Sequence, residues 1–283
     1  MACIRPHTYE DINVLLEFTR SEGWGFSEID CRATMMVDPE GLLVAEDDTG
    51  KPVGFIGCFN MVPDIMYVNL FIVRKDMRGK GIGRKLWNAM LETAGNKIVV
   101  LDSVSEMKEW YKKQGLVYEE FTVKGYKGKI ANVESDISGD SSYICEPLTN
   151  EHLPALLVYD QKIYPYSREK VLRAWYFGSD KYSFVALCDN KIVGYASCHM
   201  KSKNECIIRA LYADNDIIAD KLLVKLLSYI PKGTMIGFVI LDDKPLPKYF
   251  ADFVKTGTEF RLLMKEMPGI QTDKMIINAA HTV

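Results

Sequence analysis

One short segment, rich in glycine and in basic residues, carries the clearest chemical signal in this sequence. Residues 68–90 read VNLFIVRKDMRGKGIGRKLWNAM, with three alternating glycines between Arg78 and Arg84. Alternating glycines let the backbone approach a ligand and direct N–H groups towards it. An apolar run precedes the glycines and a helical pattern follows them, so the positive end of a helix adds to the side-chain charges. The segment therefore predicts a phosphate-binding loop between a strand and a helix.

Two other phosphate-binding motifs fit this segment less well. A P-loop requires GxxxxGK[ST], and the segment does not contain it. A dinucleotide-binding GxGxxG would need glycine at Arg84, and the strands expected before the loop are antiparallel. Asp102, about twenty residues further on, is the one feature that suits a ribose-binding acid. Binding of NADH would be needed to support a dinucleotide oxidoreductase.

A second motif lies downstream, in the segment EWYKKQGLVY at 109–118. The glycine-rich loop fits the pattern [R/Q]-x-x-G-x-[G/A], and the downstream segment resembles the fYxxxGF element that accompanies this pattern in the GNAT superfamily of N-acetyltransferases. Tyr111 and Gly115 are in place, whereas Leu116 stands where phenylalanine is usual. The two motifs together are much more specific than either alone.

The resemblance covers residues 2–125, and a degenerate form of it covers 143–268. Tandem acetyltransferases of the YitH type have a similar layout. EGW at 22–24, Asp30 and DPEG at 38–41 are similar to segments of those proteins. The resemblance implies that acetyl-CoA binds with its pyrophosphate on the loop and its pantetheine along the preceding strand. The coenzyme-binding residues would be Phe71, Ile72, Val73, Arg78, Gly79, Lys80, Gly81, Ile82, Gly83 and Arg84.

The resemblance also implies that Tyr111 is the general acid that protonates the leaving thiolate. A coenzyme thiol titrates near the cysteine value of about 8.5 and a tyrosine near 10, so this proton transfer suits neutral pH. The alternative for Tyr111 is an ordinary aromatic residue of a helix. Val104-Ser105 stands where the family often has asparagine, so one coenzyme contact is missing or replaced.

The base that deprotonates the acceptor is less well defined. An amine with a pKa of about 10.4 is neutral in only about 4 molecules per 10,000 at pH 7. Family bases often occupy positions corresponding to Tyr67 and Asn69, which are not acids here and are assigned to substrate binding. Asp102, which ends the next strand, is the candidate catalytic base, and a structural or helix-capping role for it is an equal alternative. Glu22 or a water chain could serve as the base instead. Trp24 is expected either to line the acceptor site or to pack in the core.

Hydrophobic periodicity indicates the elements that position these residues. It predicts a helix, a hairpin, and then strand, helix, strand, helix and strand, which is an α+β order with one parallel crossover. The expected ranges are 11–20, 42–46, 53–59, 65–73, 83–94, 98–101, a helix capped by Ser105 that runs to Gln114 and is ended by Gly115, and 116–124.

The sequence repeats itself at an offset of 140 residues. Val53-Gly54 matches Val193-Gly194, and Cys58 matches Cys198. Carried on without gaps, this offset places KIVVLD at 97–102 on GFVILD at 237–242. It also places the loop 74–85 on DNDIIADKLLVK at 214–225, which lacks the glycines.

We therefore expect two tandem GNAT-like domains, each a mixed, mostly antiparallel sheet flanked by helices. Residues 1–130 would be the catalytic domain that binds acetyl-CoA. Residues 140–283 would be a degenerate domain without the coenzyme loop. We call these ranges the first and second copies. The polar segment ESDISGDSS at 134–142 reads as a linker between them.

Composition narrows the class of protein further. The chain has 283 residues, 48% of them hydrophobic, a length that suggests about two domains. Its net charge of −3 argues against a nucleic-acid partner. No apolar run is long enough to span a membrane, and the first residues lack the apolar core of a signal peptide. Seven cysteines without a CxxC and four dispersed histidines suit reduced thiols in the cytoplasm and predict no metal site.

The sequence thus predicts a cytoplasmic, acetyl-CoA-dependent N-acetyltransferase that acts on a primary amine of a small molecule or peptide. A non-catalytic sensor of acyl-CoA is the alternative, because Tyr67 and Asn69 are not bases. The identity of the amine and the oligomeric state do not follow from the sequence.

Overall fold

The computed structural model describes residues 2–130, 142–267 and 269–277. Its first copy begins with a short strand and two helices, which are followed by a strand–helix alternation. The elements are β1 (Cys3–Pro6), α1 (Asp11–Ser21), α2 (Glu28–Val37), β2 (Leu42–Glu46), β3 (Pro52–Val62), β4 (Ile65–Val73), α3 (Ile82–Ala94), β5 (Ile98–Val104), α4 (Lys108–Lys113) and β6 (Tyr118–Lys129).

The second copy repeats this order with local differences. Its elements are β7 (Ile144–Pro147), α5 (Leu153–Asp160), α6 (Glu169–Tyr176), β8 (Lys181–Cys188), β9 (Lys191–Ser202), β10 (Glu205–Ala213), α7 (Asp216–Leu227), β11 (Met235–Leu241), β12 (Val254–Leu263) and β13 (Met275–Ile277). Most of the expected linker, residues 134–141, lies outside the described residues.

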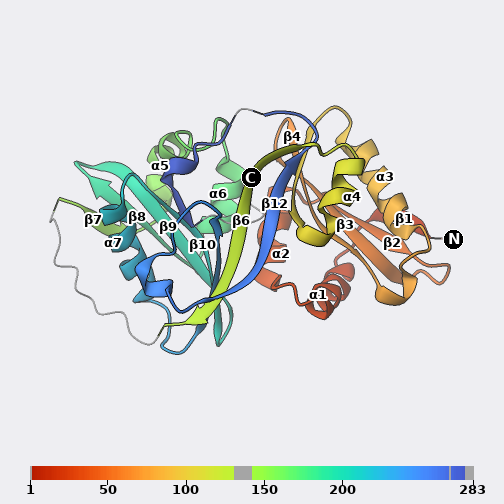
Figure 1. Cartoon of the computed structure of the whole chain (residues 1–283), viewed down its shortest axis with the longest axis horizontal. Coiled ribbons are helices and arrows are strands. Elements are labelled where there is room, and N and C mark those ends of the chain that lie inside the picture. Colours follow the sequence, from red (N-terminus) through yellow and green to blue (C-terminus); the bar gives the residue numbers. More distant parts are fainter. Residues whose placement is uncertain (1, 131–141, 268, 278–283) are drawn as a thin grey trace.

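All these strands join in one sheet, in the order β1-β2-β3-β4-β5-β12-β6-β11-β10-β9-β8-β7, with β13 beside β10. Figure 1 shows the two copies side by side, with β6 and β12 crossing between them. Most neighbouring strands are antiparallel, whereas β4–β5 and β10–β11 are parallel. This confirms the α+β prediction of mixed, mostly antiparallel pairing flanked by helices, although the sheets expected for the two copies are joined into one.

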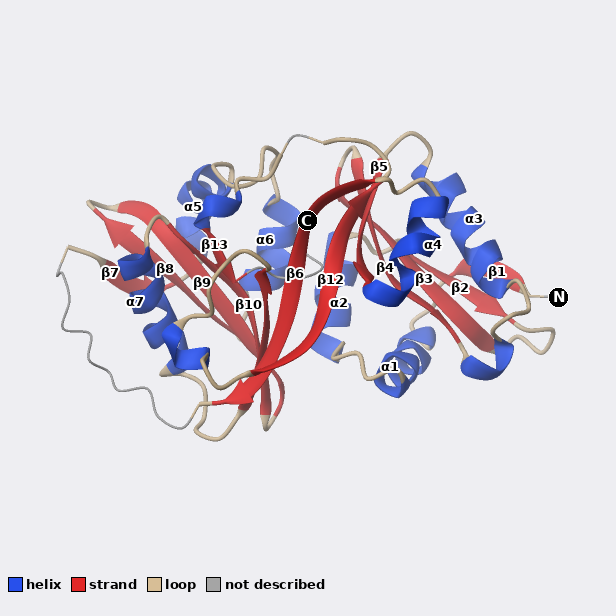
Figure 2. Cartoon of the chain, in the orientation of Figure 1, coloured by secondary structure: helices blue, strands red, loops and turns tan. Residues whose placement is uncertain are grey.

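One long strand of each copy, β6 of the first and β12 of the second, pairs with the other copy. β12 lies between β5 and β6, where Arg261 faces Asp102, and residues 123–129 of β6 pair with β11. Figure 2 shows these two long strands connecting the halves of the sheet. The ranges 1–130 and 140–283 follow the order of the chain, but each half of the sheet is completed by a strand from the other. This exchange was not predicted.

Helices cover both faces of the sheet (Figure 2). On one face of the first copy, α3 buries Leu86, Trp87 and Met90 against the strands. On the opposite face, Leu15 of α1 and Cys31 of α2 join a core cluster that continues into α5 and α6 of the second copy. The two copies therefore share a core on the side of the sheet that carries α1 and α2.

Most expected elements are present, but α2 and β1 were missed. Ser27 and Asp30 form a capping box at the start of α2, a signal that the sequence offered. Asp30 is also buried in an ion pair with Arg209 of β10, so α2 is fixed to the second copy. The expected helix at Ser105 begins later, at Lys108, and Ser105 makes no capping hydrogen bond.

Strand register confirms the offset of 140 in part of the repeat and corrects it elsewhere. Gly54 pairs with Val73 and Gly194 with Ala213, as that offset requires. In the next strands, Ile65 pairs with Ile98 and Glu205 with Met235. The offset there is 235 − 98 = 137, so the gapless match of 97–102 with 237–242 was wrong by three residues. The counterpart of Asp102 is therefore Val239.

Candidate active site

The glycine-rich loop presents an open helix N-terminus. Gly79 and Gly81 have φ angles of 76° and 80°, in the left-handed region that favours glycine. Gly81 is the N-cap of α3, and no side chain caps the helix. The first bond across this turn runs from Lys85 N to Gly81 O (3.2 Å), which leaves the amides of residues 82–84 without intrahelical partners. Such amides at the positive end of a helix bind anions.

Basic side chains surround this helix end, and most of them are exposed. Arg78 donates through Nε to the carbonyl of Val73 (2.8 Å) and through a terminal nitrogen to Glu22 (2.7 Å). Arg84 donates to Gln114 of the turn after α4 (3.1 Å). The loop thus concentrates positive charge where the amides point, which suits a pyrophosphate.

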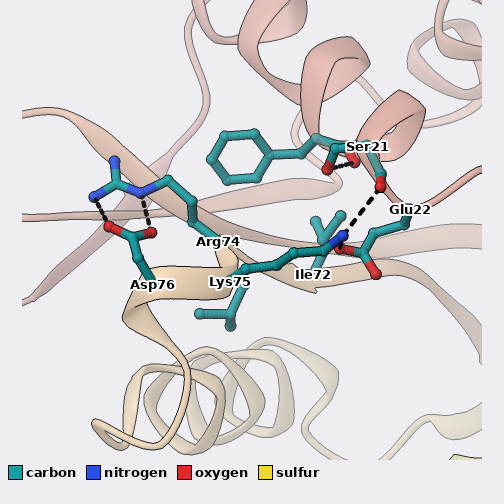
Figure 3. Close-up of a pocket in the computed structure, with 8 residues that line it drawn as sticks. Ser21, Glu22, Ile72, Arg74, Lys75 and Asp76 are labelled. Carbon is teal, nitrogen blue, oxygen red and sulfur yellow. Dashed lines mark hydrogen bonds and ion pairs between the residues drawn. The ribbon is translucent and has the colours of Figure 1, made fainter.

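A pocket of about 240 Å³ lies between the end of α1 and the end of β4. Figure 3 shows Lys75 reaching across it to Ser21 and Glu22, and Arg74 paired with Asp76. The pocket is lined by Phe18, Ser21, Glu22, Ile72, Val73, Arg74, Lys75 and Asp76. It adjoins the strand expected to bind pantetheine, so its apolar part suits a ligand that runs along β4.

β4 and β5 separate beside this pocket. Their parallel pairing ends at Val68 and Leu101, although both strands continue. A bulge in β4 follows, where Leu70 has a φ of 51°, a conformation uncommon for leucine. Bulges and positive φ at non-glycine residues cluster at functional sites. The backbone of residues 71–73 is therefore not paired with β5, and a ligand can lie along it.

The side chains of the three expected pantetheine-binding residues face different parts of the core. Phe71 packs against Trp87 and Trp110, with ring centroids 5.9 and 5.7 Å away. Ile72 is buried on the opposite face, in the core below α1 and α2, and Val73 packs on the α3 side. Their side chains thus fix the strand while its backbone edge remains for a ligand.

Tyr111 lies on α4 and is 8% exposed. Its ring packs against Trp87 and Trp110 at centroid distances of 5.6 and 5.2 Å. No hydrogen bond of its hydroxyl occurs in the described part of the chain. Burial raises the pKa of Tyr111 well above its usual value, so the hydroxyl keeps its proton at neutral pH. This state is the one that a general acid requires.

Asp102 and Tyr67 form a buried cluster with a residue of the second copy. Tyr67 donates its hydroxyl proton to Asp102 (2.8 Å), and Arg261 of β12 donates through two nitrogens (2.5 and 3.1 Å). The side chains of Asp102 and Arg261 are each 1% exposed. To accept a proton, Asp102 would have to weaken this ion pair, so the geometry favours a positioning role over that of a base. Tyr67 is fully buried within this cluster.

The other two expected substrate-binding residues lie in different environments. Asn69 follows the last β4–β5 pair, and its Oδ1 is buried without a hydrogen-bond partner among the described residues. Trp24 is 39% exposed in the turn after α1. Trp24 is therefore not a core residue, which leaves it available to line an acceptor site.

The second copy lacks the glycine-rich loop. β10 ends at Ala213 and α7 begins at Asp216, so two residues connect them where 74–81 connect β4 to α3. The expected substitution of 74–85 by 214–225 was therefore wrong, because most of the loop is deleted. The side chain of Asn215 accepts a hydrogen bond from Ile218 N (2.9 Å) and caps α7. This cap occupies one of the amides that an anion would need.

Sequence reasoning missed two charged residues of β12, Glu259 and Arg261. They alternate with Phe260 and Leu262, so they lie on one face of the second half of the strand. That alternation was a signal in the sequence. The residues that they face, however, follow only from the strand exchange.

Two family models match the chain. One described as "Acetyltransferase (GNAT) family" matches residues 8–116, and one described as "Acetyltransferase (GNAT) domain" matches residues 156–239. The chain belongs to the GNAT acetyltransferase family. It is an acyltransferase with two GNAT domains in tandem, and the finer likeness to the YitH type stays a prediction.

Individual relatives agree with this assignment. A holothin acyltransferase from Pseudoalteromonas sp. (strain SANK 73390) is 24% identical over 234 residues, which are 82% of this chain and 76% of that protein. A solved protein from Pyrococcus horikoshii, assigned as an acetyltransferase, has a TM-score of 0.76 at 18% identity and covers 99% of this chain and 95% of its own. A tandem GNAT protein from the clavulanic acid biosynthesis pathway has a TM-score of 0.66 at 13% identity, with coverages of 95% and 100%. The two solved structures show a shared fold.

The described residues contain neither a group of side chains arranged to hold a metal ion nor a helix long and apolar enough to cross a membrane.

Proposed function

We propose that this acyltransferase moves an acetyl group from acetyl-CoA to a primary amine of a small molecule or peptide. The observation that carries the proposal is the open N-terminus of α3 beside the separated strands β4 and β5. It provides an anion site next to a free strand edge, as the pyrophosphate and the pantetheine require. Residues 71–73 and 78–84 would bind the coenzyme, and Tyr111 would protonate the thiolate.

The acceptor would enter from the side of the sheet that carries α1 and α2, between Trp24 and the end of β4. The name of the curated relative makes holothin a compound to include among the acceptors tested. All seven cysteines are free thiols, which supports the proposed cytoplasmic location.

Release of CoASH from acetyl-CoA, measured with a panel of amines together with the mass of each product, tests this function. We expect CoASH and an acetylated amine in equal amounts. Saturable binding of acetyl-CoA without transfer to any amine would instead favour the sensor of acyl-CoA. Absence of binding would contradict the coenzyme site itself.

A further inference from the structure

Glu259 of β12 carries a carboxyl group that packing does not explain. Its Oε2 is buried and has no hydrogen-bond partner among the residues that the structure describes. Its neighbours in the sheet are Val104 of β5 and Val123 of β6. Burial of an unpaired carboxylate oxygen costs free energy. A retained group of this kind is a candidate for chemistry.

The strand register places Glu259 at the gap between β4 and β5. Val68 pairs with Leu101, and the same register carried forward puts Val104 level with Phe71, next to the bulge. Glu259 faces Val104 and thus lies beyond the last β4–β5 pair, at the open part of the gap. Under the proposed function, the thioester would lie at this level of β4.

The orientation of Glu259 also points to the acceptor side. Side chains two residues apart on a strand share a face, so Glu259 lies on the face of Arg261, which contacts Asp102. Leu263 continues this face into the core below α1 and α2. Glu259 therefore lies on the side of the sheet from which the acceptor would approach.

The charged and titratable groups around this position come from four strands and are Tyr67 of β4, Asp102 of β5, Glu120 of β6 and Arg261 of β12. The pKa of Glu259 is raised to about 7, first by burial and then by the nearby charge of Asp102, with Arg261 opposing the rise. A pKa near the working pH is the optimum for a group that takes a proton in a transition state.

We propose that Glu259 is the general base that takes a proton from the attacking amine, directly or through one water. This proposal rests on the proposed N-acetyltransferase function. An ammonium substrate gives one proton to the Glu259 carboxylate, and the neutral nitrogen attacks the thioester carbonyl. The C–N bond forms and the C–S bond breaks, and the thiolate takes the proton of Tyr111. The second proton of the nitrogen passes through water to the Tyr111 oxygen, and Glu259 releases its proton to solvent.

The second copy has uncharged residues at the positions that correspond to Glu259, Asp102 and Arg261. The offset of 137 turns the facing pair Val104–Glu259 into Leu241–Val123, and the pair Asp102–Arg261 into Val239–Gly125. The fold therefore accepts uncharged residues at both positions. The charges of the first copy are not a requirement of the strand exchange.

The variant Glu259→Gln tests the role, because it keeps the shape of the side chain and removes the base. We expect kcat/KM for an amine substrate to fall about 10²–10⁴-fold at pH 7, with the affinity for acetyl-CoA unchanged. In the wild type, kcat/KM should rise with pH up to about 7 because Glu259 loses its proton there. In the variant the levelling near pH 7 should be absent, and kcat/KM should keep rising towards pH 9.5 as more amine becomes neutral, so that the deficit shrinks.

Glu120→Gln is the matched control. Both carboxylate oxygens of Glu120 are also buried, and burial raises its pKa, but Glu120 lies on β6, one strand further from β5. We expect a change of less than about threefold in kcat/KM. A loss confined to Glu120→Gln, or Glu259→Gln with full activity and an unaltered pH profile, would overturn the assignment of Glu259. A wild type that transfers to no amine would instead overturn the proposed function.

Discussion

The connection from β4 to α3 in the first copy differs from the connection from β10 to α7 in the second, although the sheet around them is the same. The first copy uses residues 74–81, with two glycines of positive φ, and leaves the N-terminus of α3 without a side-chain cap. The second copy uses 214–215, and Asn215 caps α7. The strands before them keep the same register with β3 and β9. One sheet framework therefore supports both an open anion site and a closed helix end, and the connection decides which one forms.

The largest expected effect is the loss of acetyl-CoA binding when the N-terminus of α3 is blocked. Gly81→Glu should weaken acetyl-CoA binding by about 100-fold or more, because it places a like charge and a Cβ where the pyrophosphate would lie. Calorimetric titration should show one coenzyme per wild-type chain and no saturable binding in the variant. Unchanged affinity would refute the loop as the coenzyme site.

Gly233→Glu in the second copy is the control for backbone strain. Gly233 has a φ of 79°, nearly that of Gly81, and neither glycine has an atom within 4 Å of an added Cβ. Both variants should lose about 1–2 kcal/mol of stability through a left-handed non-glycine residue. Only Gly81→Glu should lose the coenzyme.

The next effect concerns the tyrosine of the first copy. Tyr111→Phe should lower kcat about 10²–10⁴-fold while coenzyme affinity changes little, since the hydroxyl acts on the leaving thiolate. Because burial raises the pKa of Tyr111, we expect no loss of wild-type rate from its ionisation up to about pH 9. Steady-state rates across this range provide the measurement.

Tyr166→Phe is the matched control for Tyr111→Phe. The hydroxyl of Tyr166 is buried without a partner in the described chain, its pKa is also raised by burial, and it lies in the second copy. Its kcat should stay within about twofold of the wild type. Equal rates for Tyr111→Phe and the wild type would show that another group protonates the thiolate.

The sequence was a good guide to local structure and a poor guide to where the chain pairs across the molecule. The strand 65–73 was predicted with its observed bounds, because an apolar run between turn residues depends on nearby residues only. The strand exchange was not visible, since any apolar strand can pair with either copy. The contact of Asp102 with Arg261, 159 residues away, was hidden for the same reason. The deleted loop was mistaken for a substituted one because a gapless offset cannot register a deletion.

A third effect tests the exchanged strand. Arg261→Met should destabilise the protein by about 3–5 kcal/mol, because it leaves Asp102 buried without its ion-pair partner. The double variant Asp102→Val, Arg261→Met should lose less, since the second copy tolerates the uncharged pair Val239–Gly125 at this position. Urea unfolding of both variants gives the two free energies. A double variant less stable than the single one would mean that the first copy does not tolerate an uncharged pair at the position of Asp102 and Arg261.

The smallest expected effect comes from removing the side-chain cap of α7 in the second copy. Asn215→Ala removes the side chain that accepts from Ile218 N, so it should cost about 0.5–2 kcal/mol of stability. The N-terminus of α7 then lacks a side-chain cap, as the N-terminus of α3 does. The two residues that connect β10 to α7 still provide no glycine-rich loop. We therefore expect no acetyl-CoA binding by the double variant Gly81→Glu, Asn215→Ala, in which the first site is closed. Calorimetric titration of that variant provides the test, and urea unfolding of Asn215→Ala checks the stability loss. Saturable binding with one coenzyme per chain would show that an uncapped helix end on this sheet suffices for the coenzyme, and that the loop serves only to expose it.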